Sequence, residues 1–103
     1  FMRQFKRLAK KYPSLVSDYD TFKKELADEP FQGSDLGSGT RKVRMAIASK
    51  GKGKSGGARV ITFNVIQHED DSIEITLLTI YDKGEISSVT DKYIKWLVSL
   101  ING

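Results

Sequence analysis

The chain of 103 residues has no cysteine and a single histidine, His68. It therefore forms no disulfide and offers no thiolate nucleophile, and it has few of the side chains that bind zinc or iron. No apolar run approaches the roughly 20 residues that a transmembrane helix needs. These absences favour a protein of a reducing cytoplasm that works without a cofactor and without a membrane.

Basic residues are concentrated in one part of the chain. Between Leu36 and His68 there are seven basic residues and no acidic one, while the remainder holds ten basic and thirteen acidic residues. This segment therefore accounts for the net charge of +4. A cationic surface of this kind is typical of proteins that bind phosphate, and RNA is the first partner to consider.

The hydrophobic pattern predicts one α+β domain over residues 1–103. Apolar residues at helical spacing predict a first helix that Pro13 ends and a second helix that Pro30 ends, and two helices so closely joined should pack as a hairpin. Strands are expected at about 42–48, 58–66 and 73–81, with a loop over 32–40. A last helix is expected over about 90–101, capped by Thr90 or Ser88.

The third expected strand, with the sequence Ile73-Glu74-Ile75-Thr76-Leu77-Leu78-Thr79-Ile80, is apolar on both faces in its middle. Strands of this kind are covered on both sides. If the helical hairpin covers one face of the sheet, the last helix or a segment of a partner protein should cover the other.

Several stretches of the sequence resemble one family when they are taken together with this order of elements. They are Arg7–Leu15 at the helix junction, Leu36-Gly37, Lys42-Val43-Arg44, the loop 49–57 with the strand start 58–61, and Leu77–Lys83. The chain resembles the RelE/ParE superfamily of bacterial toxins from type II toxin–antitoxin pairs, in particular its RelE-like branch.

The resemblance implies an antiparallel sheet of three to four strands packed against an N-terminal helical hairpin, with a C-terminal helix. Such proteins usually begin with a short strand before the first helix, and this chain is expected to lack it. The resemblance also implies an antitoxin partner and, for RelE-type members, metal-independent cleavage of mRNA on the ribosome with contacts to ribosomal RNA. We expect an antitoxin peptide to bind beside the basic face and block it.

Cleavage of RNA without a metal requires a base for the 2′-hydroxyl, cations for the charge of the phosphorane, and an acid for the leaving oxygen. His68 lies alone in an acidic turn away from the basic segment, so base and acid must be lysine, tyrosine or carboxylate. A lysine among other cations has its pKa lowered, because like charge disfavours the protonated form. A crowded lysine is therefore a chemically sensible base.

By position, the resemblance places the RelE-type catalytic residues at Lys42, Arg44, Arg59 and Lys83. The two arginines would bind the phosphorane, since arginine keeps its charge and binds two oxygens at once. Either lysine would be the base or the acid. Arg59 shares strand parity with the apolar Ile61, so its side chain is expected to start on the apolar face.

The catalytic tyrosine in the C-terminal segment of RelE corresponds to about Thr90 here, which cannot do the same work. Tyr81 or Tyr93 would have to replace it, and nothing in the sequence selects between them.

The glycine-rich stretch 49–57 is expected to form a flexible cationic loop, whose glycines let backbone amides approach phosphates. A solvated hairpin loop is the alternative. Gly53-Lys54-Ser55 is similar to the end of a P-loop, but position 48 is alanine where that motif needs glycine, and a strand follows instead of a helix. RNA-binding cations are predicted at Arg41, Lys50, Lys52 and Lys54.

Two other functions stay open. A ParE-like gyrase poison would share the fold, although gyrase poisons generally lack the cluster of Lys42, Arg44 and Arg59. A non-enzymatic basic module would bind nucleic acid or an antitoxin only. For any one of these three cations, the simplest interpretation is an edge-strand charge that prevents aggregation between sheets.

Overall fold

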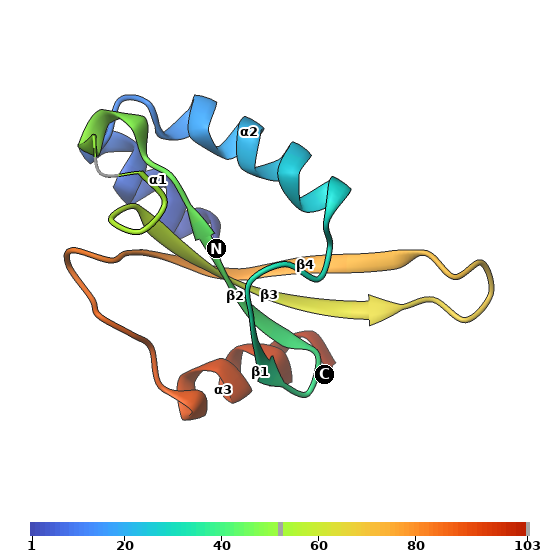
Figure 1. The fold of residues 1–103 in the computed structure, drawn as a ribbon. Coiled ribbons are helices and arrows are strands. Elements are labelled where there is room, and N and C mark those ends of the chain that lie inside the picture. Colours follow the sequence, from blue (N-terminus) through green and yellow to red (C-terminus); the bar gives the residue numbers. More distant parts are fainter. Residues whose placement is uncertain (52, 103) are drawn as a thin grey trace.

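A computed structural model describes residues 1–51 and 53–102 of the chain (Figure 1). Over these residues the fold is α+β, as the sequence predicts. The helices are α1 (Met2–Lys11), α2 (Leu15–Asp28) and α3 (Asp91–Asn102), with a short 3-10 helix η1 (Ala48–Lys50). The strands are β1 (Ser34–Gly37), β2 (Thr40–Met45), β3 (Ala58–Ile66) and β4 (Ile73–Asp82). They form one antiparallel sheet in the order β1-β2-β3-β4.

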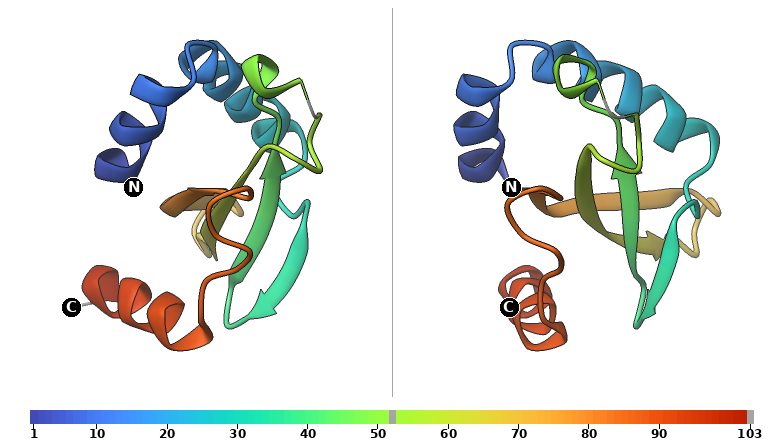
Figure 2. Two further views of the ribbon diagram at one scale, coloured as in Figure 1. Left: turned by 90° about the vertical axis from the view of Figure 1, so that its left-hand side faces the viewer. Right: turned by 60° about the vertical axis from the view of Figure 1, so that its left-hand side comes forward.

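The sheet separates two helical layers. The α1–α2 hairpin lies over one face and α3 lies on the opposite side, reached by the long segment that follows β4 (Figure 2). This arrangement confirms the prediction that both faces are covered. None of the described helices is long and apolar enough to cross a membrane.

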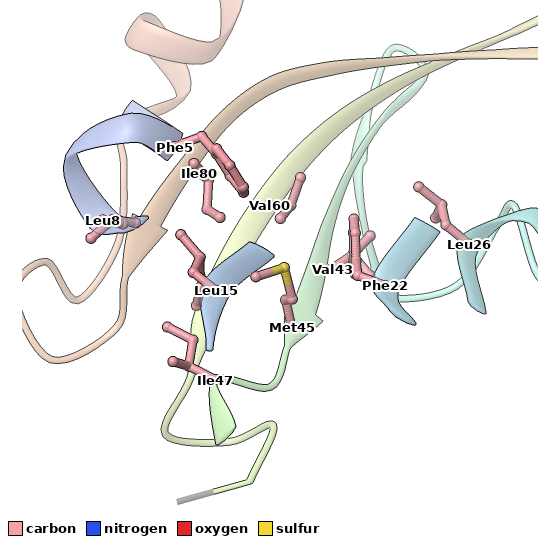
Figure 3. Close-up of a cluster of buried hydrophobic side chains, with 11 residues drawn as sticks. Phe5, Leu8, Leu15, Phe22, Leu26, Val43, Met45, Ile47, Val60 and Ile80 are labelled. Atoms are coloured by element: carbon pink, nitrogen blue, oxygen red, sulfur yellow. The ribbon is translucent and has the colours of Figure 1, made fainter. Parts of the chain in front are cut away.

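The core under the hairpin joins residues from both helices to three strands (Figure 3). Helical spacing brings Leu8 of α1 together with Leu15 and Phe22 of α2, and all three are buried. They pack on the buried strand residues Val43, Met45, Val60 and Ile80. Burial of these side chains is the main force that holds the hairpin on the sheet.

A smaller core lies between the sheet and α3. A change of register between Ile61 and Thr62 leaves Leu78 of β4 without a direct partner, because Ile61 pairs with Thr79 and Thr62 pairs with Leu77. The extra residue turns Leu78 toward α3, where it packs in one cluster with Ile61, Tyr81 and Ile94. The bulge shifts the alternation of β4, so that Leu77 and Ile80 pack on the core under the hairpin while Leu78 and Tyr81 pack on this smaller core.

Strand β1 corrects the prediction that residues 32–40 are a loop. All of its residues are exposed, so it has none of the apolar alternation by which a strand is recognised. The glycine before it allows close packing rather than flexibility: a Cβ on Gly33 would lie 2.3 Å from the backbone oxygen of Lys42. Ser34 then pairs with Lys42, and Asp35 pairs with Arg41.

The start of α3 agrees with the predicted cap. The Thr90 hydroxyl oxygen accepts a hydrogen bond from the Tyr93 backbone N–H at 3.1 Å. This bond satisfies one of the free amides of the first helical turn.

Candidate nucleic-acid interface

A hollow of about 530 Å³ lies beside β2, where the pairing with β1 stops. It is bordered by the chain that leads into β1, by β2, by the loop before β3, and by the end of β4. Among the described residues, five cations line this basic hollow and no carboxylate does. The cations are Lys42, Arg44, Lys54, Arg59 and Lys83.

Two of these cations come from β2, as its alternation predicts. Val43 and Met45 are buried in the core under the helical hairpin, so Lys42 and Arg44 leave the strand on the opposite face. Arg44 is exposed and Lys42 is half-buried. Arg44 lies directly opposite Arg59 of β3, which places two guanidinium-bearing residues side by side on one face.

Arg59 is held by the backbone of the preceding loop. Its side chain starts beside Ile61, as strand parity predicts, and the residue is 6% exposed. The guanidinium donates hydrogen bonds to the carbonyl oxygens of Lys54 at 3.1 Å, Ser55 at 2.9 Å and Ala58 at 3.1 Å. These acceptors are neutral, so the positive charge of Arg59 is not cancelled.

Lys83 follows directly after β4 and is exposed. Its ammonium group donates to the carbonyl oxygen of Ser87 at 3.0 Å, and its backbone N–H donates to the carbonyl oxygen of Gly57 at 3.1 Å. Lys54 forms an ion pair with Glu25 of α2 at 2.7 Å. Both partners of this pair reach solvent, where such pairs contribute little and exchange readily.

Two predicted RNA-binding cations lie outside the hollow. Arg41 donates to the carbonyl oxygens of Gln32 and Gly33, both at 3.0 Å, and so fastens the segment that leads into β1. The Lys50 ammonium lies 2.6 Å from Asp82, and its side chain is only 10% exposed. Lys50, which the sequence predicts to bind RNA, is therefore paired with a buried carboxylate and does not line the hollow. Lys52 lies outside the described residues.

Asp82 is a buried charged residue next to the hollow-lining Lys83, and no sequence pattern singles it out. It ends β4, is 1% exposed, and accepts hydrogen bonds from the Lys50 ammonium at 2.6 Å and the Gly84 backbone N–H at 2.8 Å. The Tyr12 hydroxyl also donates to it, and Lys11 lies 3.7 Å away. Burial by itself raises the pKa of this carboxyl, but the bonds from Lys50, Tyr12 and Gly84 outweigh it and lower the pKa to about 2.

Tyr81 lies in the core beside α3 and not in the hollow. It is 3% exposed, and its hydroxyl has no hydrogen-bond partner among the described residues. Burial raises the pKa of Tyr81, although the Arg59 charge and Ser88 oppose the shift. The prediction that Tyr81 is catalytic therefore finds no support in its position. Tyr93, the alternative, is half-buried on α3 and stacks on Trp96.

Because the Tyr81 hydroxyl is buried without a partner, we expect Tyr81→Phe to leave the fold intact. The free energy of unfolding should stay the same or rise by about 1 kcal/mol, since an unpaired buried hydroxyl is costly. Urea denaturation of both proteins measures this change. A loss of about 2 kcal/mol or more would contradict this position, because it would mean that the hydroxyl makes a stabilising hydrogen bond.

His68 lies in the exposed turn between β3 and β4, as the sequence predicts, and is far along the hairpin from the end that carries Arg59. Within residues 1–51 and 53–102, no group of three or more histidine, aspartate and glutamate side chains is arranged to hold a metal ion.

No protein-family model matches the sequence, and no solved structure matches the chain at a significant level. The resemblance to the RelE/ParE superfamily therefore stays a prediction from the sequence. The function proposed for the basic hollow depends on the geometry and charge of the residues that line it.

Proposed function

We propose that the basic hollow binds the sugar–phosphate backbone of single-stranded RNA, and that the protein cleaves mRNA without a metal as the toxin of a toxin–antitoxin pair. One observation carries the proposal. Cations from β2, β3, the loop between them and the end of β4 converge on one hollow that no carboxylate lines among the described residues.

Most of the charge in the hollow is available to a ligand. Lys42 and Arg44 form no ion pair with any described residue, and Arg59 and Lys83 are bonded only to neutral carbonyl oxygens. Lys54 alone has an acidic partner. Uncompensated cations that line a concave surface are what a polyanion needs in order to displace its counterions.

The same cations suit the chemistry of RNA cleavage. A base takes the proton of the 2′-hydroxyl, the oxygen attacks phosphorus, and the bond to the 5′ oxygen breaks as an acid protonates that oxygen. The products are a 2′,3′-cyclic phosphate and a 5′-hydroxyl. Arg44 has free donors for the charged phosphorane, and Arg59 adds charge beside it. Lys42 and Lys83 are the candidates for proton transfer.

A second candidate is an RNA-binding module that does not cleave. Two observations favour it: the terminal nitrogens of Arg59 already donate to the loop, and the Tyr81 hydroxyl is buried. In this case the hollow would bind the backbone, and the protein would act by occupying RNA.

The test uses a fluorescent single-stranded RNA and the whole chain in EDTA. We expect affinity to fall steeply between about 50 and 300 mM salt, with a log–log slope of about −0.7 for each phosphate contacted. Cleavage is followed on the free RNA and on mRNA bound to ribosomes, with detection of the cyclic phosphate. RNA binding without cleavage in either setting would support the RNA-binding module that does not cleave.

A flat salt dependence would contradict the hollow as a phosphate site. Inhibition of gyrase supercoiling by the same preparation, without RNA binding, would support the ParE-like alternative instead.

A further inference from the structure

The buried carboxylate of Asp82 joins three segments of the chain, two of which carry cations of the basic hollow. It accepts a hydrogen bond from Tyr12 at the end of α1, from Lys50 at the end of η1, and from Gly84 in the turn after β4. Lys50 begins the loop that carries Lys54, and Lys83 follows Asp82 directly. Lys54 and Lys83 both line the hollow.

The loop between η1 and β3 is held at both of its ends. At its start, Lys50 is bound to Asp82, while the Ala48 backbone N–H donates to Asp18 at 3.0 Å. At its end, Arg59 binds the carbonyl oxygens of Lys54 and Ser55. Among the described residues, the Lys54 side chain is held only by its exposed pair with Glu25. The anchors therefore determine where Lys54 stands relative to the sheet.

We infer that Asp82 is a positioning residue of the basic hollow: its carboxylate fixes the start of the loop and the turn after β4, so that Lys54 and Lys83 face the same ligand. The inference rests on the proposed RNA-binding function and names a residue that touches no ligand itself. Gly84 fits this arrangement, because a Cβ there would lie 3.3 Å from the Asp82 carboxylate and 3.4 Å from the Lys50 ammonium.

Asp82→Asn distinguishes positioning from simple electrostatics by the sign of its effect. The substitution removes a negative charge close to a basic hollow, so electrostatics alone would tighten RNA binding. If Asp82 positions the loop and Lys83, the amide holds Lys50 more weakly and the two cations become less ordered. We then expect RNA affinity to fall about threefold to fivefold, which is the value of roughly one phosphate contact near 0.1 M salt.

The matched control is Glu69→Gln in the exposed turn between β3 and β4, which makes the same charge change away from the hollow. Tyr12→Phe is the second variant, because it removes one hydrogen bond to Asp82 without any change of charge. It should weaken RNA binding in the same direction as Asp82→Asn, by a smaller factor. If Asp82→Asn does not fold, Tyr12→Phe by itself still tests whether Asp82 positions the two cations.

Limited trypsin digestion tests the anchoring without RNA. Cleavage after the lysines of the loop should become faster in Asp82→Asn and in Tyr12→Phe and stay unchanged in Glu69→Gln. If the wild type does not bind RNA, the proposed function fails, and faster loop cleavage still supports the anchoring. RNA affinity equal to or above that of the wild type in both variants would overturn the inference, and so would loop cleavage at the wild-type rate.

Discussion

Replacing Lys42 and Arg44 together with glutamine is expected to weaken binding of single-stranded RNA about 25-fold near 0.1 M salt. The two side chains leave β2 on the face of Arg59, line the hollow, and form no ion pair with any described residue. If each contacts one phosphate, the log–log salt slope should become less steep by about 1.4, because a single-stranded contact contributes about 0.7. Fluorescence anisotropy at several salt concentrations measures both values.

The control for this experiment removes the same charge from another surface. Lys23 and Lys24 are exposed on α2 and do not line the hollow, so their double glutamine variant should keep the wild-type slope. Thermal unfolding of both double variants verifies that the fold is intact. An equal loss of affinity in the two variants would show that RNA responds to net charge and not to the hollow.

The second large effect concerns acid stability. The folded-state pKa of Asp82 is about 2, below its ordinary value of 3.8, because Lys50, Tyr12 and Gly84 bind the charged carboxylate. A lowered folded-state pKa stabilises the protein above the unfolded-state value, and this contribution is lost as the pH falls through the folded-state value. We expect Asp82 to contribute about 2 kcal/mol at neutral pH and to lose it between about pH 4 and pH 2.

Urea denaturation of the wild type and of Asp82→Asn at about pH 5 and pH 2 isolates this term. The other acidic residues titrate in both proteins, so only the difference between the two unfolding free energies is read. This difference should shrink by about 2 kcal/mol at the lower pH. A difference that does not change with pH would show that Asp82 is not held as a buried carboxylate.

Part of the candidate site is readable from the sequence. Strand alternation places Lys42 and Arg44 on one face because Val43 and Met45 must enter the core, and parity places the start of Arg59 beside Ile61. These are local rules that need no knowledge of distant residues. They do not show that Lys54 and Lys83 reach the same hollow.

The sequence does not indicate which charged residues have a partner that is remote along the chain. Lys50 and Asp82 are separated by 32 positions, and Tyr12 and Asp82 by 70, so no local pattern relates them. In the sequence, Lys50 is one of several lysines in a glycine-rich stretch, whereas in the structure it forms an ion pair with a buried carboxylate. Arg41 is bound by two carbonyl oxygens that precede β1, a strand too exposed to leave a periodic signal.

The amino-acid order by itself determined the helices, the three longer strands and the net charge of the central segment, because periodicity, proline positions and composition act over a few neighbouring residues. Only the tertiary structure decided which cations line the hollow and which are neutralised inside the molecule. Burial makes an unpaired charge costly, so each buried charge takes whichever partner the packing of the strands and helices brings within reach.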